Sequence, residues 1–458
     1  MATTYDVRVW KNEVYVGKRT TTHWVLWSVD GQRRKEPFKT AALADSFRSA
    51  LVGASRQGEA FDIETGRPVS MLRAGRQSTW LALAQSFADA KWPRAAATTR
   101  RTHAEALAAV TTAMLSDRRG MPDARLIRHA LNRWAFNPTR RDDTGCPAEV
   151  RAALRWLAGH TRQASDLAKP DVLRSVLDSL TVRLDGKPAA SSVVSRRRKI
   201  LNTCLFYAVE QQILSTNPMP ALKWTPPRTS HAVDRRSVAN PTQVRTMLSA
   251  VAEQQRSGPR LVAFYACLYF AGLRPEEAAS LNRANLALPA RGWGELNIEV
   301  AEPHAGREWT DSGKNRDRRQ LKQRAVGESR TTPCPPELTA HLHHHISTFG
   351  TAADGRLFRG ERNDEEMPKG TINKTWRVAR AAAFTPEVCA SPLARTPYDL
   401  RHAAVSTWLN GGVPATQVAE WAGHSVEVLL KIYAKCLDGG TAQLRRRMDD
   451  ALGHDPGL

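Results

Sequence analysis

Pro-Tyr-Asp-Leu-Arg-His, residues 397–402, opens the stretch around which the rest of the chain is organised. A helical run follows it to Asn410, Gly411-Gly412 breaks the pattern, and a second helical run ends at Ala422-Gly423-His424. Tyr433 comes nine residues after that histidine. The pattern therefore places an arginine, a histidine and a tyrosine at the ends of successive elements.

These three residue types supply what attack on a phosphodiester needs without a metal. Arginine offers a planar fork that matches phosphate oxygens, and it keeps its charge at any physiological pH. Histidine can donate a proton, and the tyrosine hydroxyl can form a covalent phosphoester. With a pKa near 10, however, a phenol is a weak nucleophile until cationic neighbours activate it.

The stretch resembles the C-terminal motifs of the tyrosine recombinase (phage integrase) family, which run Leu-Arg-His, Leu-Gly-His and then the tyrosine at the spacings found here. The resemblance implies that Arg401 is the second catalytic arginine, His424 the histidine of the Gly-His motif and Tyr433 the nucleophile. The family usually has a histidine where this chain has Tyr398, which can hydrogen-bond a phosphate oxygen but cannot act as an imidazole. His402 does not replace that histidine by position, because the family also carries a histidine there, and we assign it a supporting role.

A second motif lies upstream, in Ala271-Gly272-Leu273-Arg274-Pro275-Glu276-Glu277. Gly272 permits a turn and Pro275 suits the first turn of a new helix, so Arg274 is presented at the junction. The motif resembles the Gly-Leu-Arg-x-x-Glu-x-x-x-Leu motif of the same family, which implies a phosphate-binding role for Arg274 and a supporting role for Glu277. The alternative is an ordinary helix–turn–helix joint with a surface arginine, which the downstream motifs make much less favoured.

A lysine is expected between these two motifs. Residues 296–300 are predicted to form a strand, and a basic segment at 314–324 precedes Arg330-Thr-Thr-Pro333. The resemblance implies a catalytic lysine in a hairpin just before such an Arg-x-x-Pro strand, where it would protonate the departing 5′ oxygen. Lys322 fits best, although the turn is about two residues longer than the family pattern, and Lys314 is the alternative or a DNA contact. A solvated basic loop is the competing interpretation.

The composition favours a polyanionic partner. Among 458 residues, lysine plus arginine exceed the acids by 67 − 45 = 22, which indicates nucleic acid more than any other partner in a chain without a long apolar run. The absence of such a run and of a signal sequence predicts no membrane association and a soluble, cytoplasmic protein. The resemblance implies a bacterial, nucleoid-associated one. Six scattered cysteines predict free thiols, and the histidines at 341 and 343–345 predict a polar helix surface more than a metal site. We expect no metal and no cofactor.

The N-terminal region is predicted to be a separate DNA-binding unit, residues 1–70. Alternating apolar residues, an Asp30-Gly31 turn and a helix after Thr40 indicate three strands and a helix. The basic hairpin residues Arg33, Arg34 and Lys35 are candidate DNA contacts, and the unit resembles the arm-type domain of phage integrases. A small β-β-β-α interaction module is the alternative.

Residues 75–225 are predicted to be helical, and residues 226–240 to form a linker before a catalytic domain at 241–458. The helical region resembles the core-binding (SAM-like) domain of the family. A charge run at the start of its last helix is either a solvated face or a set of phosphate contacts. Its members are Arg196, Arg197, Arg198 and Lys199.

The sequence thus predicts a multidomain fold that is mainly α with small β elements: a β-β-β-α arm-type domain, a helical core-binding domain and a mixed α+β catalytic domain. The resemblance implies a site-specific integrase of a mobile element, of actinobacterial type, that acts on double-stranded attachment-site DNA. It would work as a homotetramer on two duplexes, with an excisionase or a host bending factor as a possible accessory. A type IB topoisomerase-like enzyme and a non-enzymatic DNA-binding protein or relic recombinase are the alternatives.

Overall fold

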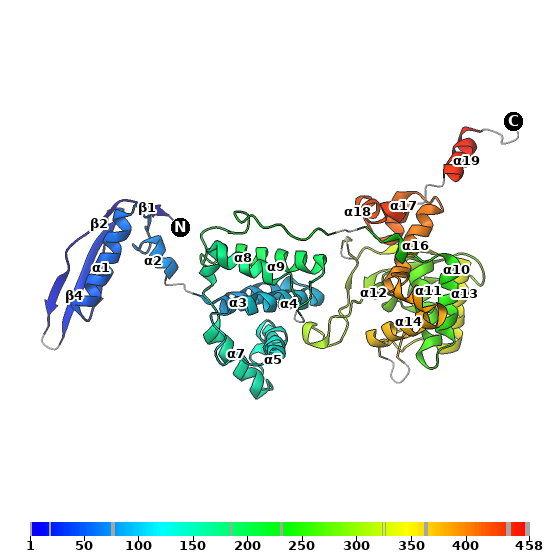
Figure 1. The fold of residues 1–458 in the computed structure, drawn as a ribbon, viewed down its shortest axis with the longest axis horizontal. Helices are drawn as coiled ribbons and strands as arrows, with labels where there is room; N and C mark the ends of the chain where they lie inside the picture. The colour runs from blue at the N-terminus through cyan, green and yellow to red at the C-terminus, as the bar shows by residue number, and fades with distance from the viewer. Residues whose placement is uncertain are drawn as a thin grey trace. The chain divides into compact units, whose positions relative to one another are not determined.

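The computed structural model describes residues 2–17, 20–74, 78–183, 186–229, 232–322, 324–325, 327–360, 365–436 and 441–453. The chain is mainly helical with small sheets, as the sequence predicts (Figure 1). It divides into two compact units, Met1–Arg94 with Thr102–Pro227, and Ala95–Arg101 with Arg228–Leu458. The change from one unit to the other at Pro227 falls inside the predicted linker, while the finer boundaries at 70, 75 and 240 stay predictions.

A four-stranded antiparallel sheet begins the first unit. Its longest strand, β4 (Thr21–Val29), pairs with β2 (Val7–Val9), β3 (Glu13–Val16) and β5 (Gln32–Phe38). The predicted turn at Asp30-Gly31 joins β4 to β5, and both of its residues have the positive φ that such a hairpin needs. Helix α1 (Ala41–Arg56), capped by Thr40 as predicted, covers one face of the sheet, and Val25, Trp27 and Val29 are buried there. The short strands β1 (Thr3–Thr4) and β6 (Phe61–Asp62) pair with each other.

Helices make up the rest of the first unit, and their apolar faces enclose its core. They are α2 (Val69–Ala74), α3 (Trp80–Lys91), α4 (Ala97–Ala113, whose first turn belongs to the second unit), α5 (Ala124–Ala130), α6 (Pro138–Arg141), α7 (Ala148–His160), α8 (Pro170–Ser179) and α9 (Ser191–Glu210). The predicted last helix, with the charge run at its start, is α9.

The second unit is built around α11 (Ser257–Phe270), which is buried almost all round, as its apolar sequence predicts. It packs against α10 (Pro241–Ala252), α13 (Pro336–Phe349) and α16 (Tyr398–Asn410). Further helices surround this core. They are α12 (Pro275–Ala279), α14 (Lys369–Ala383), α15 (Pro386–Ala390), α17 (Ala415–Ala422), α18 (Val426–Tyr433) and α19 (Thr441–Leu452).

Two small antiparallel sheets complete this unit. In the first, β8 (Gly294–Ile298) lies between β11 (Arg330–Cys334) and β7 (Leu286–Ala287). In the second, β9 (Val300–Ala301) pairs with β10 (Arg319–Gln320). The predicted strand at 296–300 is therefore divided between β8 and β9, and the basic segment at 314–324 contains β10. Among the residues that the structure describes, no helix is long and apolar enough to cross a membrane.

Candidate active site

The turn between α11 and α12 presents Arg274, as the sequence predicts. Gly272 has φ +58°, and a Cβ atom there would lie 2.6 Å from the Trp408 ring, so the position requires glycine for its conformation and for the available space. Pro275 occupies the first turn of α12, and the backbone N–H of Arg274 donates to Glu277 Oε2 at 2.9 Å. The local sequence therefore fixes both the turn and the direction of the arginine.

Glu277 is 1% exposed and lies at the centre of a cluster of guanidinium groups. Arg274 Nη1 donates to its Oε1 at 2.5 Å, and Arg330 donates to both carboxylate oxygens at 3.1 and 2.8 Å. Arg401 Nη1 lies 3.8 Å from Oε2. Burial opposes ionisation of Glu277, but Arg330, Arg274 and Arg401 outweigh it and hold the pKa of the carboxyl well below its usual value.

This cluster carries an excess of buried positive charge. The three arginines are each less than a tenth exposed and face one carboxylate, so the net charge is 3 − 1 = +2. Buried charge without a counter-ion is costly, and guanidinium groups match phosphate oxygens in shape and charge. The site is therefore suited to an anion of about two charges.

Arg401 joins the two ends of the site. From α16, its guanidinium donates to the backbone carbonyls of Gly272, in the α11–α12 turn, and Ala422, at the end of α17. It also donates to His424 Nε2 at 3.0 Å. Because an arginine can only donate, Nε2 accepts, and a neutral His424 carries its proton on Nδ1. That Nδ1 is buried and has no hydrogen-bond partner within the described part of the chain.

The surroundings of His424 favour a neutral imidazole. Burial lowers the pKa of its imidazole to about 3, and the positive charges of Arg401, Arg274 and Arg330 act in the same direction. A neutral imidazole with an unpartnered N–H can donate a hydrogen bond to an incoming anion.

Gly423 ends α17 in the left-handed conformation, with φ +62°, and positions His424. Its carbonyl accepts a hydrogen bond from Arg274 Nη2 at 2.8 Å. A Cβ atom at this residue would lie 2.5 Å from Arg330 Nη1 and 3.4 Å from Arg274 Nη1. The Gly-His motif thus contacts the arginine cluster directly through its backbone.

Tyr433 is the last residue of α18 and is 1% exposed. Its hydroxyl lies 2.9 Å from His402 Nδ1, and its ring centroid lies 6.2 Å from that of His424. Burial raises the pKa of the phenol despite the opposing effect of Arg401 and Arg274. The structure therefore places the tyrosine beside the arginine–histidine cluster as a neutral phenol.

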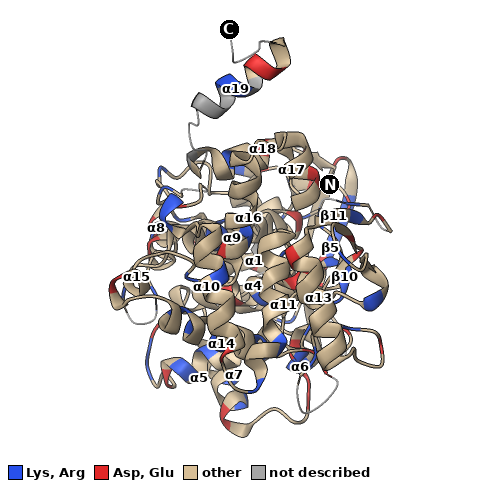
Figure 2. Cartoon of the chain, turned by 90° about the vertical axis from the view of Figure 1, so that its right-hand side faces the viewer, with Lys and Arg blue, Asp and Glu red and all other residues tan. Residues whose placement is uncertain are grey.

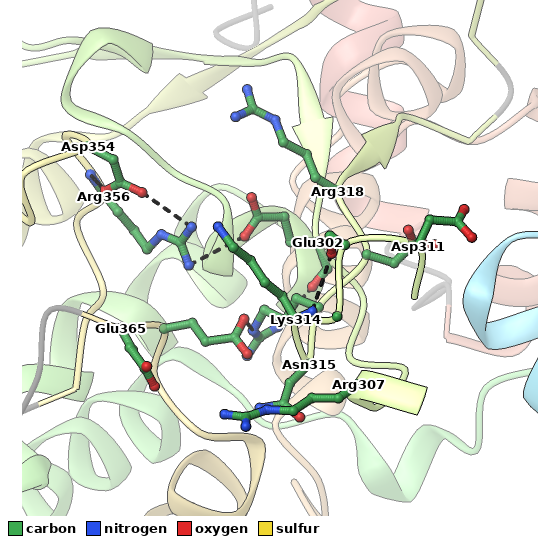
Figure 3. A pocket seen from close by; sticks show the side chains of 14 residues that line it. Glu302, Arg307, Asp311, Lys314, Asn315, Arg318, Asp354, Arg356 and Glu365 are labelled. Atoms are coloured by element: carbon green, nitrogen blue, oxygen red, sulfur yellow. Dashed lines mark hydrogen bonds and ion pairs between the residues drawn. The ribbon is translucent and has the colours of Figure 1, made fainter. Parts of the chain in front are cut away.

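Tyr398 and Lys322 line one pocket of about 450 Å³, together with His304, Arg319 and Lys369. Lys322 is exposed and lies two residues after the end of β10. Lys314 lines a different pocket of about 700 Å³, where Glu302, Arg356 and Glu365 also lie (Figure 3). The two pockets share Arg316. Of the two candidate lysines, Lys322 lines the pocket that contains Tyr398, and Lys314 lines the other.

Comparisons with known proteins were made for the sequence and for the fold. No family model matches the sequence, and no curated protein matches it. The fold is similar to the Tn1549 transposon integrase in complex with transposon right end DNA (15% identity, 75% of this chain and 99% of the other, TM-score 0.46). It is also similar to the XerH site-specific recombinase bound to its difH substrate (11% identity, 77% of this chain and 95% of the other, TM-score 0.43). A lambda integrase dimer bound to a core site is similar as well (12% identity, 90% of this chain and 91% of the other, TM-score 0.47).

In its sequence motifs the chain resembles the tyrosine recombinases. The solved structures show a likeness of fold at low sequence identity, and the resemblance in detail is carried by Arg274, Arg401, His424 and Tyr433. Those four residues come from motifs spread over 160 positions, 274 to 433. Arg401 contacts His424 directly and lies with Arg274 around Glu277, and the ring centroid of Tyr433 lies 6.2 Å from that of His424.

Arg330 is the site residue that sequence reasoning missed. The recombinase pattern marked residues 330–333 only as a strand, and β11 does begin there. Strand alternation carries a usable signal, since it places Arg330 on the same face as Thr332 and Cys334, which are both buried. A buried arginine requires an acidic partner, and Glu277 is that partner.

The three candidate DNA contacts in the basic hairpin of the first unit lie on opposite faces of the four-stranded sheet. Arg33 and Lys35 lie on the face away from α1, over the rings of Trp10 and Trp24 at 5.7 and 5.0 Å. Arg34 lies on the α1 face, where its Nη2 donates to the backbone carbonyl of Ile63 at 3.0 Å. The geometry leaves Arg33 and Lys35 available to a partner and gives Arg34 a structural role.

Only two of the four basic residues at the start of α9 are exposed. Arg196 and Lys199 are exposed, whereas Arg197 is half-buried and donates to the carbonyl of Leu180 at 3.1 Å. Arg198 is partly buried as well. Arg196 and Lys199 therefore remain the accessible candidates for phosphate contacts.

The histidine-rich helix α13 differs from the prediction of a polar surface at one position. His345 is buried and its Nε2 lies 3.0 Å from the carbonyl of Leu357, because helical spacing turns it toward the core with Leu338 and Leu342. Within the described residues, no group of three or more His, Cys, Asp or Glu side chains could hold a metal ion. All six cysteines are free thiols.

Proposed function

We propose that this protein is a tyrosine-type site-specific DNA recombinase, the integrase of a mobile element. The proposal rests on one observation, the buried cluster of positive charge to which Arg274 and Arg401 belong. His424 contacts this cluster, and Tyr433 lies beside it. A phosphodiester carries one negative charge and its pentavalent transition state carries two, which matches that excess, and Tyr433 lies beside the cluster.

The proposed reaction proceeds through a covalent enzyme–DNA bond. Tyr433 attacks the scissile phosphorus, the bond to the 5′ oxygen breaks, and a 3′-phosphotyrosyl link forms. Arg274 and Arg401 bind the nonbridging oxygens as their charge grows, and loss of one such donor typically costs about 10²–10³ in rate. His424 donates to the same oxygens, and Lys322 protonates the leaving oxygen from the pocket that it shares with Tyr398. Together these cations supply the positive charge that Mg²⁺ supplies in other phosphoryl-transfer sites.

The proposed partner is double-stranded DNA at attachment sites. The excess of 22 positive charges supports it, and so do the basic residues on the open sheet face and on α9. For strand exchange, the free 5′ hydroxyl of a second duplex reverses the attack, which requires a homotetramer on two duplexes. An excisionase or host bending factor would set the direction.

A DNA substrate nicked next to the scissile phosphate tests the proposal, since it traps the covalent intermediate. We expect a 3′ adduct with the intact protein, none with Tyr433→Phe, and at least a 10²-fold slower reaction with Arg274→Ala. Strand exchange between two sites would then distinguish a recombinase from a relaxing enzyme of the topoisomerase IB type. Specific binding with no adduct would instead support a DNA-binding protein without catalysis.

A further inference from the structure

His402 lies between the proposed nucleophile and the position where the tyrosine recombinases usually have a histidine. It occupies α16 one helical turn after Tyr398, and the two ring centroids are 5.0 Å apart in an edge-on contact. Its Nδ1 lies 2.9 Å from the Tyr433 hydroxyl, within the range of a good hydrogen bond. It is thus the imidazole in direct contact with the reacting oxygen.

We propose that His402 is the base that takes the proton of Tyr433, so that this chain supplies from position 402 the imidazole that it lacks at position 398. The inference rests on the proposed function and extends it. During attack, the Tyr433 O–H bond breaks, its proton moves to His402 Nδ1, and the phenolic oxygen forms the bond to phosphorus. The bond from phosphorus to the 5′ oxygen breaks at the same time, and on religation the imidazolium returns the proton to Tyr433.

The surroundings of His402 suit a proton acceptor. Tyr398 and Arg401 face it from α16, and Tyr433 faces it from α18. Burial, reinforced by the charge of Arg401, lowers the pKa of its imidazole to about 4, so the ring is neutral and has a lone pair available at neutral pH. Once DNA phosphate neutralises part of the arginine charge, the imidazolium formed during attack becomes less costly.

His424 is a poorer candidate for this role. Its Nε2 accepts from Arg401, and its remaining nitrogen carries the proton, so it has no free lone pair for the phenol. It can therefore donate to phosphate oxygens while His402 accepts from the nucleophile. The two histidines divide the donor and acceptor roles.

Two substitutions distinguish a base from a positioning residue. His402→Asn places an amide oxygen near the position of Nδ1 and keeps a hydrogen-bond acceptor with no useful basicity, while His402→Ala removes both. The measurement is the single-turnover rate of adduct formation on the nicked substrate, with urea unfolding to check that each variant folds. We expect both variants to be at least about 10²-fold slower than the intact protein, in the range of general-base effects. Asparagine restoring the rate would show a positioning role and overturn the proposal.

The pH profile and the leaving group give two further readouts. With the base present, the rate is expected to be nearly constant from pH 6 to 8, whereas in His402→Ala it should rise about tenfold per pH unit, because hydroxide must then ionise the phenol. A substrate with sulfur in place of the 5′ oxygen needs no protonation of its leaving group. It should therefore leave the defect of His402→Ala unchanged, and a restored rate would place His402 at the leaving group instead.

These outcomes distinguish a failure of the proposed recombinase function from a failure of the role proposed for His402. If the intact protein forms no adduct on either substrate, the proposed recombinase function fails. If it forms the adduct and His402→Asn reacts within threefold of it, only the role of His402 fails.

Discussion

Glu277 holds three arginines in place, and its substitution is the most informative stability test at the residue scale. Glu277→Gln keeps the shape of the side chain but leaves the guanidinium groups of Arg274, Arg330 and Arg401 without a buried counter-charge. Removing one partner from a buried ion pair typically costs about 3–5 kcal/mol. We expect a loss of that size in the free energy of unfolding, measured by urea titration.

A surface ion pair provides the matched control. Arg245 and Glu337 are 2.8 Å apart with side chains 56% and 35% exposed, so Glu337→Gln should cost less than about 1 kcal/mol. Equal losses in the two variants would contradict a central role for Glu277.

The same carboxylate predicts a pH dependence. Because the folded-state pKa of Glu277 lies well below its usual value of 4.5, its contribution to stability is complete above that value. It is lost progressively as the pH falls from 4.5 towards the folded-state pKa. We expect the intact protein to lose stability over that acidic range more steeply than Glu277→Gln, with the difference measured by urea titration at each pH.

At this scale the sequence predicts the motif residues better than their partners. Arg274, Arg401, His424 and Tyr433 could be singled out as candidates because each lies in a motif with fixed spacing. Arg330 could not be assigned its partner, since its ion pair with Glu277 joins positions 53 residues apart. The contact of His402 with Tyr433 likewise depends on how α16 packs on α18, which no local pattern specifies.

Gly423, at the end of α17, shows how an element end controls the site. Alanine at this residue would strain a backbone at φ +62° and place its Cβ atom 2.5 Å from Arg330 Nη1. We expect Gly423→Ala to destabilise the second unit by about 1–3 kcal/mol and to slow adduct formation at least tenfold, because both contacted arginines must move. Urea unfolding and the nicked substrate measure the two effects.

Gly370 in α14 is the control for that substitution. A Cβ atom there contacts nothing within 4 Å, so Gly370→Ala should be neutral or stabilising by up to about 1 kcal/mol. If both alanine variants behave alike, the close approach at Gly423 has no functional consequence.

Strand β5 shows what a charge pattern in the sequence cannot resolve. Three consecutive basic residues look equivalent until pairing with β4 fixes the register, which puts Arg33 opposite Ser28 and Arg34 opposite Trp27. Because side chains alternate along a strand, one register decides which charges face outward. Arg33 and Lys35 then share the open face with Arg8 and Trp24, and Arg34 faces α1.

This register predicts different effects for neighbouring arginines. The double variant Arg33→Gln, Lys35→Gln should weaken DNA binding and reduce the dependence of log K on log salt by about 2, one for each lost phosphate contact. Arg34→Gln should leave that slope unchanged and lower the unfolding temperature, since it loses the bond to Ile63. Fluorescence anisotropy at several salt concentrations measures the slope, and equal slopes in the two variants would contradict the assignment of faces.

At the scale of the whole molecule, one part of the boundary between the units, at residues 95–101, follows contacts that no composition change marks. The first residues of α4 belong to the second unit, where Arg100 pairs with Asp311 at 2.7 Å and the N–H of Ala97 donates to Asp317. These pairs join positions more than 200 residues apart. The predicted linker is also partly packed, since Val233 is buried and its N–H donates to the carbonyl of Ile432. Fold class could be predicted from periodicity, but such long-range contacts could not.

Helix α19 bears on the proposed tetramer. Along this helix the basic residues precede the acidic ones (Figure 2). Met448 and Leu452 lie four residues apart, on one side of the helix, and are 62% and 66% exposed. Two large apolar side chains in one exposed stripe favour burial against a second copy.

Substitution of that stripe separates assembly from chemistry. The double variant Met448→Ser, Leu452→Ser should form the covalent adduct on a single nicked site at the rate of the intact protein, because the catalytic cluster does not include α19. Strand exchange between two sites should fall at least tenfold, and light scattering should detect smaller protein–DNA complexes in place of tetramers. Asp449→Asn, on the same helix, is the control, and it should change neither the rate of strand exchange nor the size of the protein–DNA complexes. A tetramer that persists with the apolar stripe removed would mean that other surfaces hold the four subunits together, because the only change made to the variant is the loss of the side chains proposed to join them.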